Sequence, residues 1–326
     1  MTSVVKKIGI MTSGGDAPGM NAAVRAAVRT AAAMDIEIVG IRRGYQGLIT
    51  GDFISLSADD VSGIASRGGT ILFTARSEEY KTREGVRRSA DICRSAGIEG
   101  IVAIGGDGTF RGTLELSQEG IAVSCIPATI DNDIAGTTYT IGFDTACNTA
   151  VEAIDRLRDT MKSHERCSVV EVMGRESGHI ALAVGIACGA ACILVPEEKY
   201  DLERDVLGRI LKARRHGRTH LLVIVAEGAA KAQDVADKIV AEMGIETRVT
   251  VLGHVQRGGT PLCHDRIVGS RMGYTAVKML AAGERDKMVG LDGGKYISIP
   301  LAEAMSMTKG LDSEISVILD VLTAYR

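Results

Sequence analysis

The stretch Ile126-Pro127-Ala128-Thr129-Ile130-Asp131-Asn132-Asp133 follows directly on an apolar run that begins at Ile121. The run predicts a buried strand, which Pro127 ends because proline cannot donate a hydrogen bond to a sheet ladder. Two carboxylates therefore follow the carboxyl end of a strand, where open α/β sheets bind their ligands. A carboxylate held there beside the Thr129 hydroxyl is a candidate general base. The alternative is that residues 131–133 only shape a turn, as Asp and Asn often do.

A second acidic segment follows another short apolar strand, Ile101–Ile104. This strand leads into Gly105-Gly106-Asp107-Gly108-Thr109-Phe110, whose three glycines let the backbone approach a ligand and turn its amides toward phosphate oxygens. Asp107 could hold a magnesium ion against those oxygens. A glycine-rich turn alone is weak evidence, because glycine suits any tight turn. Two such strand ends in succession favour a functional site.

The first strand end in the chain is also glycine-rich. Residues Thr12 to Asn21 contain Gly14, Gly15 and Gly19 and lead into a helical pattern. Their amides and the helix dipole would favour an anion. The spacing matches neither the Walker A motif nor the dinucleotide-binding motif. We therefore expect a phosphate-binding loop of another kind, with a plain strand-to-helix turn as the alternative.

Strand-like and helical segments alternate along the chain. With 326 residues, of which 45% are hydrophobic, the chain can form a large core, most simply divided into two domains. Alternation of this kind predicts βαβ units and an α/β fold with mostly parallel sheets. The expected helices include Asn21–Met34, Thr149–Thr160, Leu202–Arg215 and a core helix within Ile180–Val195. The expected strands are Lys7–Met11, Glu37–Ile41, Ile101–Ile104, Ile121–Ile126, Ser168–Met173, Cys192–Val195, Leu221–Ala226 and Arg248–Leu252.

Composition excludes several classes of partner. The formal net charge of −3 gives no reason to expect a nucleic-acid or membrane partner, and 3% aromatic residues argue against a stacking platform for single strands. The apolar segment Ile8–Met11 is too short for a signal peptide, and Ile180–Val195 is short for a membrane span. Seven cysteines without a Cys-x-x-Cys pair are expected to be buried free thiols in a reducing cytoplasm.

Several basic residues lie beside strand ends or glycines. Any one of them could be a solvated surface residue. As a set they predict a polyanion site, because the arginine fork matches phosphate geometry. Glu227, after the apolar strand Leu221–Ala226, could accept sugar hydroxyls or could simply be a helix-start carboxylate. The basic residues are Arg76, Arg166, Arg175, Arg248, His254 and Arg257.

Five motifs in this order resemble the bacterial ATP-dependent 6-phosphofructokinases over essentially the whole chain: TSGGDAPGMNAA, IGGDGT, PATIDND, VVEVMGR and VLGHVQRGG. The resemblance implies a glycolytic kinase that passes the γ-phosphoryl group of ATP to the 1-hydroxyl of fructose 6-phosphate, with Mg²⁺. It implies that Asp131 is the general base, that Thr129 and Arg175, together with Arg76, stabilise the moving phosphoryl group, and that Asp107 is the magnesium ligand.

The resemblance also implies binding positions and an assembly. It implies a homotetramer in which Arg166 and Arg248 reach a neighbouring subunit's site. It also implies that Tyr45 lies near the nucleotide. The implied nucleotide positions are Gly15, Arg76, Ser77, Gly106, Asp107, Gly108 and Thr109. The implied sugar-phosphate positions are Thr129, Asp131, Arg166, Met173, Gly174, Arg175, Glu227, Arg248, His254 and Arg257.

Two doubly wound, three-layer domains with a discontinuous division are implied as well. The nucleotide domain would use residues 1–142 and 256–306, and the fructose 6-phosphate domain residues 143–255 and 307–326. Gly108 and Ala128 favour ATP over pyrophosphate, because pyrophosphate-using relatives carry aspartate and lysine there. A carboxylate in place of Gly108 would block and repel the α-phosphate of ATP.

The effector site is where the sequence departs from the resemblance. Bacterial relatives bind ADP and phosphoenolpyruvate through a cluster of cations and one carboxylate, which Arg25, Arg29, Arg158 and Arg218 match in part. However, Ala58 replaces an arginine, Ala191 replaces the carboxylate and His216 replaces a lysine. Each lost charge-assisted hydrogen bond forfeits about 1.5–3 kcal/mol, so we expect weak or altered regulation.

Two other functions fit parts of the sequence. One is a pyrophosphate-dependent transferase or a kinase for another phosphorylated sugar, with the same machinery. The other is a catalytically silent homologue that binds nucleotide and assembles with active subunits. The joint presence of Asp107, Thr129, Asp131 and Arg175 argues against the silent homologue.

Overall fold

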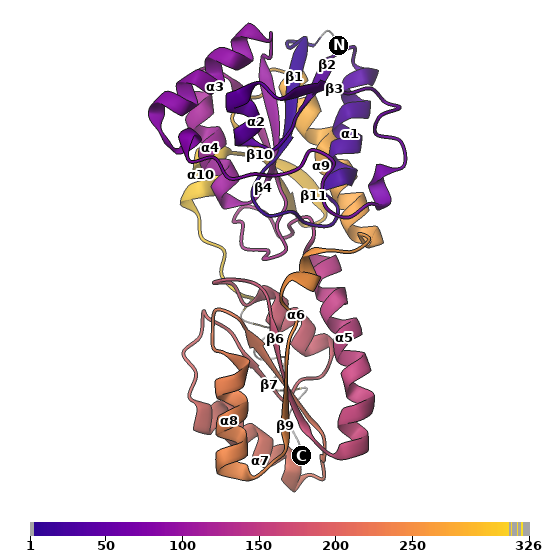
Figure 1. Ribbon diagram of the computed structural model, residues 1–326, viewed down its shortest axis with the longest axis vertical. Coiled ribbons are helices and arrows are strands. Elements are labelled where there is room, and N and C mark those ends of the chain that lie inside the picture. The colour runs from indigo at the N-terminus through magenta and orange to yellow at the C-terminus, as the bar shows by residue number, and fades with distance from the viewer. Residues whose placement is uncertain (1–2, 313, 315–317, 319–320, 322–326) are drawn as a thin grey trace. The chain divides into compact units, whose positions relative to one another are not determined.

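The computed structural model describes residues 3–312, 314, 318 and 321. The chain divides into two compact units. The first unit comprises the residues up to Ile130, then Ile134–Thr145 and Arg257–Lys309. The second comprises Asp131–Asp133, Ala146–Gln256 and the described residues from Gly310 onward. Each unit is built on its own sheet (Figure 1).

The first unit is built on a mixed sheet. Among the described residues this sheet has seven strands in the order β11-β10-β5-β4-β1-β2-β3. The central pairs are parallel, and only the outer pairs, β10 with β11 and β2 with β3, are antiparallel. The strands are β1 (Lys7–Thr12), β2 (Glu37–Ile41), β3 (Phe53–Ser55), β4 (Gly100–Gly105), β5 (Ala122–Pro127), β10 (Lys287–Asp292) and β11 (Lys295–Pro300).

Helices cover both faces of this sheet (Figure 1). α1 (Met20–Ala33) and α9 (Cys263–Ala281) pack together on one face. Their close approach depends on glycine. A Cβ at Gly269 would lie 2.9 Å from the Gly19 carbonyl oxygen, and one at Gly273 would lie 2.3 Å from that of Ala23. The opposite face shares a hydrophobic core with α2 (Tyr45–Thr50), α3 (Arg83–Ser95), α4 (Asp107–Gln118) and α10 (Leu301–Ser306). Short 3₁₀ turns lie at Ile64–Ser66 and Glu79–Lys81.

The second unit has a parallel sheet in the order β7-β8-β6-β9. Its strands are β6 (Cys167–Val172), β7 (Cys192–Leu194), β8 (Leu221–Ala226) and β9 (Thr247–Val251). β8 is buried along its whole length, as expected for a parallel strand covered on both faces. The helices are α5 (Phe143–His164), α6 (His179–Ala187), α7 (Gly208–Arg215) and α8 (Ala232–Met243), with a 3₁₀ segment, η4, at Gly253–Arg257. α7 and α8 share one core cluster with the sheet.

The predicted fold class is confirmed, because both units are α/β with mostly parallel sheets. Three details differ from the sequence-based expectation. The predicted helix Leu202–Arg215 begins as a π-helix, Leu202–Leu207, before α7. The strands β3, β10 and β11 were not predicted: β3 has three residues, β10 is buried only at residues 288–290, and β11 is half-buried or exposed throughout. Cys263 is exposed because it begins α9, whereas the other six cysteines are buried as expected.

None of the helices in the described ranges combines the length and the apolar character that crossing a bilayer requires.

Candidate active site

Three neighbouring strands of the first unit deliver the predicted loops to one edge of the sheet. β1, β4 and β5 are parallel, with Thr12 opposite Ile104 and Ile104 opposite Ile126. The loops that follow are joined directly: the Ser13 amide donates to the Ile104 carbonyl at 3.0 Å, and the Ala128 amide to that of Gly105 at 2.9 Å. The glycine loop, the GGDGT segment and Thr129 therefore emerge together in this unit.

The turn from β4 into α4 leaves no room for side chains at Gly105. A Cβ there would lie 2.4 Å from the Thr109 hydroxyl oxygen and 2.5 Å from the Ser13 carbonyl oxygen. The Thr109 hydroxyl is buried and makes no hydrogen bond. By contrast, a Cβ at Gly108 would meet nothing within 4 Å. The segment thus has an unpartnered buried hydroxyl at Thr109 and open space at Gly108, both in the first turn of α4.

Asp107 is the first residue of α4 and is half exposed. Its Oδ2 accepts a hydrogen bond from Arg111 Nη2 at 2.6 Å, one helical turn further on. Across residues 3–312, 314, 318 and 321, no group of three or more His, Cys, Asp and Glu could enclose a metal ion. A single exposed carboxylate with a nearby hydroxyl suits magnesium, which is usually held by one or two carboxylates together with substrate phosphates. The residues present therefore fit a nucleotide-bound Mg²⁺.

Asp131 and Arg175 are brought together in the second unit. The Asp131 side chain is only 7% exposed, and its Oδ2 lies 3.6 Å from Nε of Arg175, whose side chain is 67% exposed. Asn132 has a φ of 52°, so the turn that the sequence allowed does form there. Because its neighbour Asp131 is buried against a cation, a turn alone does not account for that carboxylate.

Glu227 holds the loop that carries Arg175. Its Oε1 accepts the Gly174 amide at 3.1 Å and the Arg175 amide at 2.8 Å. This loop is unusual in its backbone, since Arg175 has a φ of 54° and Gly174 a φ of 146°. Ser177 closes it, donating its hydroxyl to the Asp131 carbonyl at 3.0 Å. Glu227 thus has a structural contact that its predicted role as a sugar ligand did not include.

Gln256 is a residue that the sequence analysis did not single out. It is completely buried, and its Oε1 accepts the Met173 amide at 2.9 Å, while its Nε2 donates to the Ala146 carbonyl at 3.4 Å. It therefore ties the end of β6 to the start of α5. Its neighbour His254 lies in the same 3₁₀ segment, η4, and is exposed.

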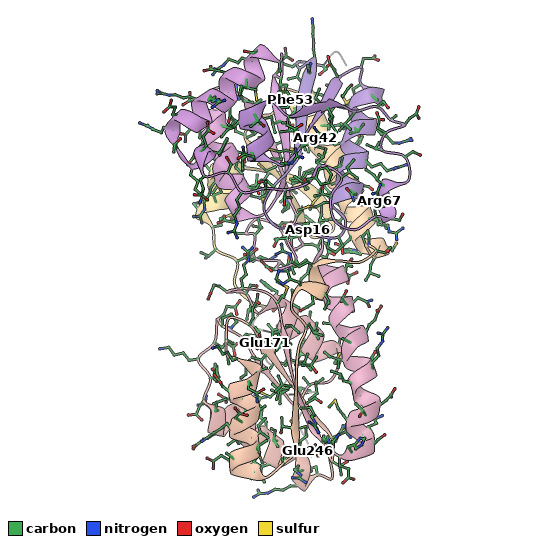
Figure 2. The ribbon with its side chains drawn as sticks, in the orientation of Figure 1. Asp16, Arg42, Phe53, Arg67, Glu171 and Glu246 are labelled. Atoms are coloured by element: carbon green, nitrogen blue, oxygen red, sulfur yellow. The ribbon has the colours of Figure 1, made fainter. Side chains whose placement is uncertain are left out.

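Arg166 and Arg248 share one carboxylate. Arg166 Nε lies 2.8 Å from Glu246 Oε2, and Arg248 Nη2 lies 2.7 Å from Glu246 Oε1. Glu246, labelled in Figure 2, immediately precedes β9. The Arg166 guanidinium, with Arg248 beside it, holds the pKa of Glu246 below its usual value. The two arginines predicted to bind phosphate are therefore oriented as a pair within the second unit.

Arg257 lies against the first glycine loop in the first unit. A Cβ at Gly15 would lie 1.5 Å from Arg257 Nη2, so only glycine leaves the guanidinium its place. Arg257 Nε also lies 3.8 Å from Asp16 Oδ1, the residue labelled in Figure 2. Arg257 thus joins the loop that carries the predicted nucleotide position Gly15.

The other predicted nucleotide residues differ in exposure. Arg76 is exposed, and Ser77 is buried with its hydroxyl accepting the Tyr80 amide at 3.3 Å. Tyr45 is buried and stacks on Tyr80, with its hydroxyl donating to the Thr109 carbonyl. Tyr45 therefore supports the GGDGT segment from the core.

The predicted effector residues fall into two groups, one in each unit. Arg25 and Arg29 lie on α1 and line a hollow with Tyr274 and Lys278, and Arg29 Nη2 donates to the Ala58 carbonyl at 3.4 Å. In the second unit, Arg158, Arg218, His220 and Ala191 line another hollow.

The chemistry of the second hollow is cationic. Partial burial, followed by the charges of Lys162, Arg218 and Arg158, lowers the pKa of His220. Arg158 donates to the Cys188 carbonyl, and His216 Nδ1 lies 2.9 Å from the Lys212 carbonyl oxygen of its own helix. The carbon side chain of Ala191 supplies no carboxylate to this hollow.

Comparisons with known proteins give a consistent result. A family model described as "Phosphofructokinase" matches residues 7–280. The ATP-dependent 6-phosphofructokinase of Clostridium tetani is 50% identical over 319 residues, covering 98% of this chain and 100% of that protein. The enzyme of the same description from Clostridium botulinum is 49% identical over the same coverage.

Solved structures agree with this. A phosphofructokinase from Saccharomyces cerevisiae superposes with a TM-score of 0.87 at 36% identity, over 98% of this chain but 47% of the yeast chain, so this chain spans about half of its length. A pyrophosphate-dependent phosphofructokinase from Marinobacter aquaeolei superposes with a TM-score of 0.84 at 22% identity, over 98% of this chain and 92% of that one. The latter likeness bears on the fold alone.

Proposed function

Because the chain belongs to the phosphofructokinase family, we propose that it transfers the γ-phosphoryl group of ATP to the 1-hydroxyl of D-fructose 6-phosphate. The products are fructose 1,6-bisphosphate and ADP, as expected for a glycolytic kinase. The observation that carries the proposal is the buried Asp131 carboxylate facing the exposed Arg175 guanidinium. A carboxylate can take the proton of an attacking hydroxyl, and a neighbouring cation can neutralise charge on the transferred phosphoryl group.

Asp131 is the general base in this mechanism. The oxygen of the 1-hydroxyl forms a bond to the γ-phosphorus, the bond from that phosphorus to the β-phosphate oxygen breaks, and the hydroxyl proton passes to the Asp131 carboxylate. Arg175 and Arg76 neutralise charge on the equatorial oxygens, and the Thr129 hydroxyl donates to the moving group. Positioning and positive charge supply most of the catalysis in phosphoryl transfer.

Asp107 would hold Mg²⁺, which when bound neutralises charge on the phosphates. The half-exposed carboxylate, the unpartnered Thr109 hydroxyl and the α4 amino terminus support this assignment. The remaining nucleotide contacts would come from Gly15, Ser77, Gly106 and Gly108, so the first unit would be the nucleotide domain.

The second unit would bind fructose 6-phosphate. Its substrate residues would be Asp131, Arg166, Met173, Gly174, Arg175, Glu227, Arg248 and His254. Thr129 and Arg257 are the predicted substrate residues that belong to the first unit. The paired arginines on Glu246 would grip the 6-phosphate, and in a cytoplasmic homotetramer Arg166 and Arg248 would serve a neighbouring subunit's site. The exposure of Arg248, whose side chain is 65% exposed, supports a role toward a partner or ligand.

ATP is proposed as the donor, with support from the open space at Gly108 and the small buried side chain of Ala128. The test is the initial rate of fructose 1,6-bisphosphate formation by the purified chain with magnesium, comparing ATP with pyrophosphate. Turnover with ATP alone supports the proposal. Turnover with pyrophosphate alone contradicts the argument from Gly108, and no turnover with either contradicts the assigned activity.

Regulation by ADP and phosphoenolpyruvate is proposed to be weak or altered. Arg25, Arg29, Arg158 and Arg218 would still contact an effector phosphate, but Ala58, Ala191 and His216 lack the charges expected there. We expect a nearly hyperbolic response of the rate to fructose 6-phosphate, with little change on adding ADP. A strongly sigmoidal response that low ADP relieves would contradict this.

A further inference from the structure

Asp265 is a fully buried carboxylate that the proposed mechanism does not use. It lies in the first turn of α9, yet its oxygens accept hydrogen bonds from a distant segment. Oδ1 accepts the Tyr139 hydroxyl at 2.7 Å and the Gly142 amide at 2.6 Å. Oδ2 accepts the Thr145 amide at 3.0 Å and the Thr145 hydroxyl at 2.5 Å. Four donors on one buried carboxylate offset the cost of its burial.

This carboxylate caps the start of α5 from another helix. The Gly142 and Thr145 amides belong to the end of the helix where unpaired N–H groups and the positive end of the dipole lie. The Thr145 hydroxyl also accepts the Leu262 amide at 3.0 Å, which joins the same segment to the residue preceding α9. Segment 139–145 is therefore fixed to the amino terminus of α9.

Segment 139–142 in turn holds the end of β5. The Thr140 hydroxyl donates to the Thr129 carbonyl at 2.6 Å, and the Ile141 amide donates to the Pro127 carbonyl at 3.1 Å. Ala128 and Ile141 form an isolated parallel bridge. The backbone of residues 127–129, and with it the direction of the Thr129 side chain, depends on this segment.

α9 can transmit this constraint because it is closely packed against its neighbours. It packs on α1 through Gly269 and Gly273, and a Cβ at Gly19, the residue before α1, would lie 3.2 Å from the Asp265 Cβ and 2.7 Å from a methyl group of Ile141. The glycine loop, segment 139–142 and Asp265 are thus packed against one another within the first unit. Nothing in this arrangement requires Asp265 to touch a substrate.

We propose that Asp265 is a positioning residue for phosphoryl transfer, which fixes segment 139–142 and through it the Thr129 side chain. The inference rests on the proposed function of Thr129. A displacement of about 1 Å in a catalytic group can cost about a hundredfold in rate. Asp265→Asn keeps the shape of the side chain but replaces one carboxylate oxygen by an NH₂ group. Whichever oxygen is replaced, its two hydrogen-bond donors lose their acceptor.

The first experiment compares Asp265→Asn with wild-type enzyme at a temperature where both are folded, as judged by thermal unfolding. We expect kcat to fall by about 10- to 100-fold and the KM for ATP to change by less than about threefold. The matched control is Asp52→Asn, because the Asp52 carboxylate pairs with Arg42 and Arg43 elsewhere in the same unit. It should lower the melting temperature and leave kcat unchanged. A lower melting temperature with wild-type kcat in Asp265→Asn would overturn the proposal.

A second pair of variants keeps the test decisive if Asp265→Asn does not fold. Thr140→Val removes the hydroxyl that holds the Thr129 carbonyl, and Thr140→Ser keeps it. We expect kcat to fall in the first and to be restored in the second. Equal rates in the two variants would contradict the transmission through segment 139–142.

Hydrogen exchange separates this inference from the assigned reaction. Thr140→Val should raise amide exchange in peptides covering residues 127–130, whatever the substrate is, because that contact is lost. Unchanged exchange there would refute the positioning role. A wild-type enzyme that fails to phosphorylate fructose 6-phosphate would instead refute the proposed function.

Discussion

Replacing Glu227 by alanine should reduce turnover by releasing the loop that carries Arg175. The Glu227 carboxylate accepts two backbone amides, those of Gly174 and Arg175. Hydrogen bonds to a charged acceptor contribute about 1.5–3 kcal/mol each, so the pair could contribute about 3–6 kcal/mol. Glu227 and Arg175 are both exposed, and water can replace part of this, so we halve the sum. About 1.5–3 kcal/mol corresponds to a loss in kcat of about 10- to 100-fold.

The assay must separate this loop role from direct binding of sugar hydroxyls. A coupled assay of fructose 1,6-bisphosphate at saturating ATP gives kcat and the KM for fructose 6-phosphate separately. Loss of sugar contacts alone raises KM, whereas displacement of Arg175 should lower kcat, because Arg175 is proposed to act on the transferred phosphoryl group. Glu227→Gln should have the smaller effect, less than about tenfold in kcat, since one oxygen can still accept both amides.

The matched control is Glu171→Ala in the same unit, labelled in Figure 2. The Glu171 side chain also accepts a backbone amide, that of Ala232 at 2.9 Å, at the start of α8. Its loss should cost about 0.5–2 kcal/mol of stability, the usual value of a helix cap, with kcat unchanged. If Glu227→Ala kept kcat within about twofold of wild type and only raised KM, the loop argument would be wrong.

Three further predictions test separate parts of the site. Gly108→Asp should fold normally, because its Cβ meets nothing within 4 Å, but should lose at least about tenfold in kcat/KM for ATP through repulsion of the α-phosphate; unchanged ATP kinetics would refute the steric argument. Asp131→Ala should lower kcat by about 10²- to 10⁴-fold in the same assay, and near-normal turnover would remove Asp131 from the role of base. In native enzyme a maleimide should label Cys263 alone, because burial raises the pKa of the Cys93, Cys125, Cys167 and Cys192 thiols to about 12. Mass spectrometry would locate the label, and modification of native Cys263→Ser would contradict this.

The sheets were predictable from sequence because buried parallel strands are continuous apolar runs. β4 and β8 are buried along their whole length, and each was expected to within two residues. The hairpin of β10 and β11 was missed although its turn, Gly293-Gly294, carries the positive φ values of 52° and 77° that suit a two-residue hairpin. β11 is an edge strand with mixed, largely exposed side chains, so the turn is a stronger signal of this hairpin than the composition of its strands.

The proximity of Asp131 to Arg175 does not follow from strand position, because they come after β5 and β6, which belong to different sheets; only the resemblance placed both residues in one site. The residues that hold the loops could not be found in this way. Asp265 lies in a helical pattern with charged neighbours and reads as a surface residue, yet its partners Tyr139 and Thr145 lie more than a hundred positions earlier. Burial of a single polar residue depends on such long-range contacts, and no local periodicity reports them.

Asp265, Glu227 and Gln256 share one physical role, which is to accept backbone amides with a side-chain oxygen. Loops at the carboxyl ends of parallel strands leave the sheet ladder, so their amides lose their regular partners and each needs another acceptor if it is buried. A side-chain oxygen anchored on a helix or at a strand end can satisfy these amides. Glu227 accepts the amides of Gly174 and Arg175, and Gln256 accepts that of Met173, all of them predicted site residues. Asp265 accepts the amides of Gly142 and Thr145, in the segment that holds the Thr129 backbone. On the proposed function, these acceptors would set the geometry of phosphoryl transfer together with the residues that would touch the substrate.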